Sequence, residues 1–386
     1  MRSCLILLAV AALCAAEPRE ISYGGVLSMP SRLRDGRLIS LAAAARPFSE
    51  MEIAGPEQPV YRRISSDNGD TWSRDEKVFA YRAGAGTFAS QTYTLVDKTG
   101  YVHAFNVRYF KLARAKEKQP GHSELFHCIS KDDGKTFSQP QRVNFGHDYT
   151  GAINSIIQLK SGRIVGGLSY TSDHIVEGVG QYEFRVVTFY SDDSGDTWKV
   201  GQDEIRVPFG PQVVHPGAIE PILTELSPNR LWILIRTQTL RFYEAFSTNG
   251  GQSFDAPRAS RFMAPDSPGA VVRLKDGRLV MCWNDIQSYA NGVSGHFRQY
   301  LYAAISKDNG ASWSKPRRVG PLQSPENPGS RGDYPYLCET ADGSVLLYYT
   351  RFGLRPGASY EKQHNELVRL DPDWLQGIGR NIDSGQ

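Results

Sequence analysis

The sequence predicts an all-β protein that folds as a six-bladed β-propeller with four antiparallel strands in each blade. Two repeated patterns and one absence predict this fold. A motif of the type SxDxGxTW occurs five times, and a short turn between apolar runs occurs six times. Almost no segment shows the apolar period of 3.6 residues that an amphipathic helix needs. Repeats at a period of this size are typical of an architecture in which each unit packs on its neighbours.

The five-fold motif is interpreted as scaffold. Its copies begin 65, 61, 56 and 59 residues apart. In four copies an aspartate (Asp67, Asp132, Asp193 or Asp308) can accept hydrogen bonds from the amides of its own turn, and in all five a glycine can take the positive φ that a tight turn needs. The closing aromatic residue can pack between strands or blades. The copies are SSDNGDTW (65–72), SKDDGKTF (130–137), SDDSGDTW (191–198), STNGGQSF (247–254) and SKDNGASW (306–313).

The six-fold pattern supplies the hairpins. Each copy has a short polar turn between apolar or β-branched runs, as in RLRDGRLIS and RLKDGRLVM. A unit therefore contains a first strand, this turn, a second strand, a longer loop, a third strand, the SxDxGxTW turn and a fourth strand. Six such units of about 60 residues make a six-bladed propeller. The hairpin copies lie at 32–40, 95–104, 158–166, 225–233, 273–281 and 339–347.

The N-terminal residues predict export. Arg2 precedes an apolar stretch, 5–12, that is too short to span a bilayer, and small residues follow up to Ala16. We expect residues 1–16 to be a signal peptide, with a buried N-terminal helix as the alternative, and residues 17–386 to form one propeller. The mature protein is then secreted or periplasmic, with no integral membrane segment. A net charge of +3 without a basic arm gives no reason to expect a nucleic-acid partner.

The cysteines predict neither a disulfide framework nor a metal site. Cys128, Cys282 and Cys338 remain after removal of residues 1–16, and each lies among apolar or β-forming neighbours. We expect all three to be buried thiols. The chain contains no HExxH, paired CxxC or phosphate-binding loop, so no cofactor or metal is expected.

The strand order predicts which face carries the chemistry. Both kinds of turn fall on one face of the disc, while the first strands begin on the other face. Alignment of the first strands on their turns gives Glu220 in blade four and Tyr334 in blade six equivalent positions on the second face. Arg236 ends the second strand of blade four, and Arg298 begins the third strand of blade five. We expect these four side chains to converge at one end of the central channel. The alternative is that Glu220 and Arg236 merely pair at a polar channel mouth.

These features resemble the sialidase (neuraminidase) superfamily over nearly the whole chain after residue 16. SxDxGxTW resembles its Asp-box, and EPILTELSPNRLWILIRTQ resembles its segment with a catalytic glutamate and a carboxylate-binding arginine. The resemblance implies that Tyr334 is the nucleophile and Glu220 its base, while Arg236 and Arg298 bind the substrate carboxylate. A neutral phenol suits an anomeric carbon that carries a carboxylate, because an anionic nucleophile would be repelled there.

The sequence departs from the family pattern in blade one. SMP, at 28–30, stands where the family has an arginine, and Arg32 lies too close to the turn to replace it. Arg46 is a candidate substitute. The loop that follows has no aspartate for the acid/base role, so Glu50 and Glu52 are the candidates for it.

We therefore expect a secreted glycoside hydrolase of sialidase type that removes a terminal sialic acid or a related acidic sugar from a glycan. One alternative is a polysaccharide lyase or another glycosidase that acts on uronate-containing glycans, with His147, His215 or His296 in proton transfer. Another is a propeller that binds glycans without catalysis.

Overall fold

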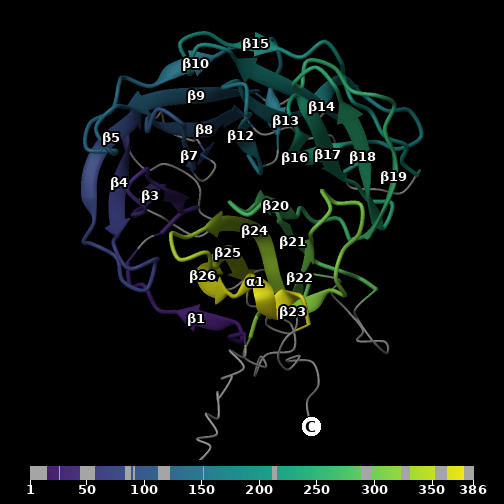
Figure 1. The fold of residues 1–386 in the computed structure, drawn as a ribbon. Helices are drawn as coiled ribbons and strands as arrows, with labels where there is room; N and C mark the ends of the chain where they lie inside the picture. Colours follow the sequence, from purple (N-terminus) through teal and green to yellow (C-terminus); the bar gives the residue numbers. More distant parts are fainter. Residues whose placement is uncertain are drawn as a thin grey trace, which may run out of the picture.

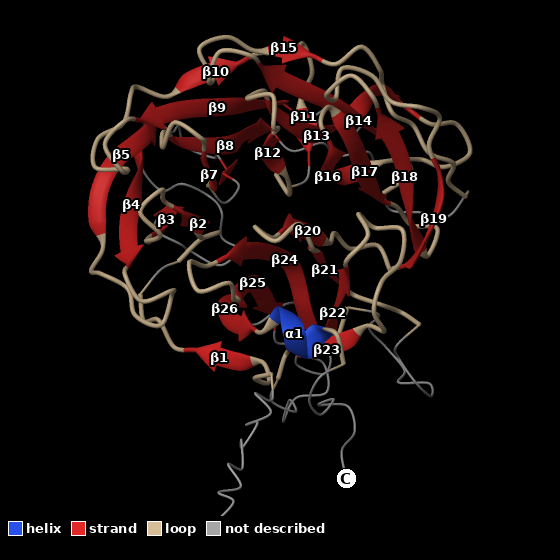
Figure 2. Cartoon of the chain, in the orientation of Figure 1, coloured by secondary structure: helices blue, strands red, loops and turns tan. Residues whose placement is uncertain are grey.

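The computed structural model shows that the chain is a ring of β-sheets. It describes residues 15–25, 27–43, 57–82, 88–89, 92–111, 122–150, 152–210, 215–287, 298–322, 331–352 and 363–377. Nearly all of the regular secondary structure in this part of the chain is strand, as Figure 2 shows. The single helix in these ranges is α1 (Pro372–Leu375), far too short to cross a bilayer, and no helix there could do so.

Six antiparallel sheets are arranged around a centre, which confirms the predicted six-bladed propeller. Figure 1 shows β7, β12, β16, β20 and β24 around the centre, with β5, β10, β15 and β19 at the periphery. In blades two and three the innermost strand is in two pieces. The strands of blades one to three are β2 (Ser31–Arg32), β3 (Leu38–Ala43), β4 (Glu57–Ser65), β5 (Glu76–Arg82); β6 (Phe88–Ala89), β7 (Tyr93–Val96), β8 (Val102–Lys111), β9 (His122–Ser130), β10 (Gln141–Val143); β11 (Tyr149–Thr150), β12 (Ile156–Gln158), β13 (Ile164–Ile175), β14 (Tyr182–Ser191) and β15 (Lys199–Val200).

Blades four to six follow the same plan with unbroken inner strands. Their strands are β16 (Ile219–Ser227), β17 (Arg230–Arg236), β18 (Arg241–Ser247), β19 (Arg258–Met263); β20 (Ala270–Arg273), β21 (Leu279–Trp283), β22 (Leu301–Ser306), β23 (Arg317–Gly320); β24 (Arg331–Glu339), β25 (Val345–Phe352) and β26 (Gln363–Leu370).

The outermost strand of blade six comes from the other end of the chain. β1 (Arg19–Ile21) pairs antiparallel with β26, with Ile21 opposite Leu367. Blade six has no SxDxGxTW turn, and α1 follows its third strand instead. The ring is therefore closed by hydrogen bonds between the first and last strands of the described chain. The predicted cleavage after Ala16 would leave β1 in the mature protein.

The SxDxGxTW turns have the scaffold role predicted for them. In blade one, Asp67 accepts hydrogen bonds from the amide of Thr71 (2.9 Å), its hydroxyl (2.5 Å) and the hydroxyl of Ser65 (2.8 Å). Gly69 has a φ of +95° and donates its amide to Ser65. In blade four Asn249 Oδ1 accepts the equivalent bonds from the Ser247 hydroxyl and the Ser253 amide, whereas Asn249 Nδ2 donates to the Ser253 hydroxyl (2.7 Å). The closing aromatics pack against the hydrophobic core: Trp72, Phe137, Trp198, Phe254 and Trp313.

Both kinds of turn lie on one face, as predicted. Arg37 of the blade-one hairpin forms an ion pair with Asp133 of the next SxDxGxTW turn (2.9 Å). Asn229, in the β16–β17 turn, accepts a hydrogen bond from Gly250 (2.9 Å). Because Ile219 and Arg236 pair at the other end of β16 and β17, this end lies on the opposite face of the disc. The three cysteines at 128, 282 and 338 are buried free thiols, which confirms that prediction.

Candidate active site

Matching bulges in two inner strands position Glu220 and Tyr334. In β16 the register shifts between Ile219 and Ile222, and in β24 it shifts in the same way between Asp333 and Tyr336. Glu220 has a φ of +51° and Tyr334 a φ of +53°. A proline follows each residue, and a proline cannot donate to the strand ladder, so a bulge is a natural place for it. Left-handed backbone at a non-glycine residue costs about 1–2 kcal/mol, which identifies both positions as candidates for function.

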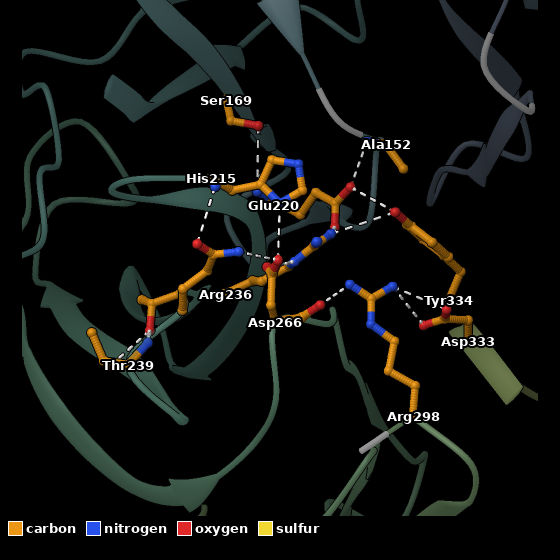
Figure 3. Close-up of polar contacts among 12 residues, drawn as sticks. Ala152, Ser169, His215, Glu220, Arg236, Thr239, Asp266, Arg298, Asp333 and Tyr334 are labelled. Carbon is orange, nitrogen blue, oxygen red and sulfur yellow. Dashed lines mark hydrogen bonds and ion pairs between the residues drawn. The ribbon is translucent and has the colours of Figure 1, made fainter. Parts of the chain in front are cut away.

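Glu220, Tyr334 and Arg236 are in direct contact (Figure 3). The phenol of Tyr334 donates to Glu220 Oε1 at 3.3 Å, and Arg236 Nη1 donates to Glu220 Oε2 at 2.5 Å. Arg236 Nη1 also lies 3.4 Å from the phenol oxygen. Glu220 and Arg236 are each 2% exposed, so their attraction is little screened by water. The amide of Ala152 fixes Glu220 Oε1 from the neighbouring blade at 3.1 Å.

Arg298 joins this group through two aspartates that the sequence reasoning missed. Its Nη1 lies 3.0 Å from Asp333 Oδ2, and its Nη2 donates to the backbone carbonyl of Asp266. Asp266 Oδ1 in turn accepts from Arg236 Nε at 2.7 Å. Asp266 therefore connects the two arginines, and the fully buried Asp333 holds Arg298 beside Tyr334. Of these two aspartates, only Asp333 could have been found from the sequence, because it is the neighbour of Tyr334.

Burial and charge set the protonation of the phenol. Burial raises the pKa of Tyr334 to about 12, and the Glu220 carboxylate adds to the rise, while Arg236 and Arg298 oppose it. The phenol is therefore neutral near pH 7 and loses its proton only with the help of a base. Tyr109, on β8, is also close enough to Glu220 and Tyr334 to be affected by their charges. Burial raises its pKa, and so do the charges of Glu220 and Tyr334.

His215 and Gln238 extend the network beyond Asp266. His215 Nδ1 lies 2.9 Å from Asp266 Oδ2, and Gln238 Nε2 donates to the same oxygen at 2.6 Å. The amide of His215 donates to Gln238 Oε1 at 3.1 Å. Although burial favours the neutral acid, the hydrogen bonds and charges of His215 and Arg236 hold the pKa of Asp266 well below its ordinary range. Asp266 is therefore ionised at neutral pH.

The other sequence-predicted residues have different positions. Arg46, Glu50, Glu52 and His296 lie outside the described residues. Arg32 pairs with Glu339 (3.3 Å) and donates to the carbonyl of Thr340 in the blade-six hairpin turn, so it is on the far face, as predicted. The exposed ring of His147 stacks on Tyr170 with a centroid distance of 3.9 Å.

The arrangement is suited to chemistry by side chains. In the ranges that the structure covers, no three His, Cys, Asp or Glu residues gather in a way that could hold a metal ion. A neutral phenol touches a carboxylate that can accept its proton, and two guanidinium groups flank the pair. Such a set can deliver an oxygen nucleophile and stabilise negative charge beside it.

Comparison with known proteins identifies the family. Residues 54–347, more than half of the chain, match the family described as BNR repeat-like domain, and the protein belongs to that family. It is also 28% identical over 369 residues to a sialidase of Micromonospora viridifaciens, an alignment that covers 89% of this chain and 51% of that protein. The chain thus spans about half the length of this curated relative.

Solved structures share the fold at low identity. A protein of unknown function from Dyadobacter fermentans DSM 18053 superposes with a TM-score of 0.62 at 18% identity, covering 92% of this chain and 98% of that one. The K499G mutant of the NanB sialidase from Streptococcus pneumoniae superposes with a TM-score of 0.62 at 12% identity, covering 90% of this chain and 69% of that one. At identities this low, the similarity to these structures shows a shared propeller fold and nothing about activity.

Proposed function

We propose that this protein is an exo-glycosidase that removes a terminal acidic sugar, sialic acid or a related acid, from a glycan. Tyr334 is the nucleophile, Glu220 takes its proton, and Arg236 and Arg298 bind the carboxylate of the sugar. The observation that carries the proposal is the 3.3 Å contact between the Tyr334 phenol and Glu220, with Arg236 against both groups. The sialidase relative from Micromonospora viridifaciens supports the same class of reaction.

The electrostatics favour a phenol over a carboxylate as the attacking group. The anomeric carbon of a sialic acid carries a carboxylate, so an anionic nucleophile would approach against repulsion, whereas the neutral phenol does not. As the phenol oxygen attacks, its proton passes to Glu220. The growing phenolate character is stabilised by Arg236, which already lies within 3.4 Å.

Charge balance in the site limits how the sugar carboxylate is bound. Arg236 is already paired with Glu220 and Asp266, and Arg298 with Asp333. Each guanidinium has five N–H donors, so a ligand carboxylate can share an arginine with its protein partner. Because the protein carboxylates already offset much of the positive charge of the two arginines, the site attracts one anionic group only moderately. Binding is therefore expected to depend on the shape of the sugar as well as on its charge.

One screen and one variant test the proposal. The protein should release the chromogenic group from an α-linked acidic glycoside and leave neutral glycosides intact, and Tyr334→Phe should abolish this release. Tyr101→Phe, which alters a partly buried tyrosine beside the hairpin turn on the opposite face, is the matched control. Full activity of Tyr334→Phe would exclude the mechanism. An unsaturated, ultraviolet-absorbing product from a uronate polysaccharide would identify a lyase, and binding without turnover would identify a lectin-like propeller.

We also propose that the protein acts after export, with residues 1–16 removed as a signal peptide. The charged, apolar and small-residue regions of 1–16 support this proposal. N-terminal sequencing of the protein recovered from its natural compartment should begin at Glu17. A mature chain that begins at Met1 would contradict it.

A further inference from the structure

We propose that His215 is the general acid/base of the site and that Asp266 is its positioning residue. The inference rests on the proposed glycoside cleavage, and it adds the group that exchanges a proton with the leaving sugar and with water. Tyr334 and Glu220 account only for the nucleophile. Glycoside cleavage also needs a proton donor for the departing oxygen.

The hydrogen bonds fix which ring nitrogen of His215 faces its partner. Asp266 is ionised, and an ionised carboxylate only accepts hydrogen bonds. Nδ1 of His215, 2.9 Å from Asp266 Oδ2, must therefore carry a hydrogen. Gln238 braces both residues, because it donates to Asp266 and accepts from the amide of His215. The ring of Phe184 stands perpendicular to the imidazole at a centroid distance of 5.4 Å. The imidazole is thus held on two sides.

The other ring nitrogen, Nε2, is available for a substrate. The side chain of His215 is 36% exposed, and no other described residue forms a hydrogen bond with Nε2. In Figure 3 a dashed line joins the His215 imidazole to the Asp266 carboxylate. A short chain of contacts leads from His215 through Asp266 to Arg236 and then to the Tyr334 phenol.

Each of the three carboxylates described in the site is already committed. Glu220 contacts Tyr334 and Arg236, the buried Asp333 contacts Arg298, and Asp266 contacts Arg236 and His215. None of them is as exposed as His215. An imidazole whose Nδ1–H is held by a carboxylate is an effective donor and acceptor at its other nitrogen, because the carboxylate stabilises the imidazolium.

The proposed steps balance in atoms and protons. First, the Tyr334 oxygen bonds to the anomeric carbon and its proton passes to Glu220. The bond from that carbon to the leaving oxygen breaks, and the leaving oxygen takes the Nε2 proton of the His215 imidazolium. Second, water attacks the anomeric carbon and gives a proton to Nε2. The bond to the Tyr334 oxygen breaks, and that oxygen recovers its proton from Glu220. Both side chains return to their initial protonation.

The test compares leaving groups in His215→Gln. A 2,4-dinitrophenyl glycoside of the acidic sugar departs without protonation, whereas an alkyl glycoside needs a proton donor. The full-length variant should lose about 10²–10⁴-fold in kcat/KM on the alkyl glycoside and less than about fivefold on the dinitrophenyl glycoside. His122→Gln is the matched control, because His122 forms a surface pair with Asp148 at 2.8 Å. An unchanged melting temperature shows that each variant is folded.

Every outcome decides the role of His215. Equal losses on both glycosides would mean that His215 only positions other groups, and a variant that behaves like His122→Gln would remove it from the reaction. Either result overturns the inference and leaves the Tyr334 mechanism intact. A wild-type protein that cleaves neither glycoside would refute the proposed function, and the role of His215 with it. A rise in the kcat of His215→Gln with added azide on the dinitrophenyl glycoside would further support a base in the second step, which kcat reports and kcat/KM does not.

Discussion

The replacement of Glu220 by glutamine tests the nucleophile pair most directly. The phenol of Tyr334 has a pKa of about 12, so its ionisation at pH 7 costs about 7 kcal/mol at 1.36 kcal/mol per pKa unit. A base in contact lowers this cost by taking the proton as the new bond forms. Removal of such a base lowers a rate by about 10²–10⁴-fold, or about 3–5 kcal/mol in the barrier.

The same substitution should change the phenol in the opposite sense. The Glu220 carboxylate is one cause of the raised pKa of Tyr334, so Glu220→Gln should lower that pKa while it slows turnover. Turnover of a chromogenic acidic glycoside measures the first effect. The second effect, the lower pKa, is measured by NMR in protein with 13C-labelled tyrosine, from the pH dependence of the resonance of the carbon that carries the phenol oxygen. The Tyr334 resonance is assigned by its absence in Tyr334→Phe.

The control lies on the same strand. Glu225 accepts hydrogen bonds from the amides of Lys160 and Asn229 at the hairpin end of β16, away from Arg236, and Glu225→Gln should keep the wild-type kcat. A fall in kcat of less than threefold in Glu220→Gln, in a folded variant, would refute the role of Glu220 as the base. A large fall with no change in the Tyr334 titration would refute the electrostatic account.

Three further predictions concern substrate binding, pH and the repeated turns. Arg298→Lys should raise KM for the acidic glycoside at least tenfold with a smaller change in kcat, because an ammonium cannot reproduce a planar two-pronged contact; equal KM values would contradict the carboxylate role. Burial, with the charge of His103 adding to it, lowers the pKa of His127 to about 3, below the unfolded value of about 6.5. Its contribution to stability is therefore present above pH 6.5 and is lost as the pH falls, by about 2.7 kcal/mol between pH 8 and pH 4.5. Denaturant unfolding should show this difference in the wild type relative to His127→Gln, and parallel pH curves for the two proteins would refute it. Asp132→Asn should change the free energy of unfolding by less than about 0.5 kcal/mol, because Asn249 in the blade-four turn keeps all three bonds and only reverses the one with the Ser253 hydroxyl. Asp132→Ala should cost about 1–2 kcal/mol, and equal losses in the two variants would contradict this reading.

The fold was predictable because its signals are local and repeated. Each SxDxGxTW turn and each hairpin turn is encoded within about ten residues, and five or six copies reinforce one another. β1 was not predicted, because a strand of three residues, Arg19–Ile21, carries no pattern of its own and its partner β26 is at the other end of the chain.

The candidate site was predictable only where the repeats aligned it. Glu220 and Tyr334 share one position in the inner strands, and the Glu–Pro and Tyr–Pro pairs were visible signs of their bulges. Asp266 has no such counterpart. It lies in the connection between β19 and β20, and its contacts with His215, Arg236 and Arg298 come from distant parts of the chain. No pattern along the sequence indicates such a junction.

The pairing of β1 with β26 has a consequence for biosynthesis. Residues 19–21 emerge from the ribosome long before residues 367–369, the part of β26 with which they pair. Five blades can form from residues that are neighbours in the chain, while the sixth must wait with an open sheet edge. A bulky fusion protein joined close to Arg19 would obstruct this last step, so affinity tags are better placed elsewhere.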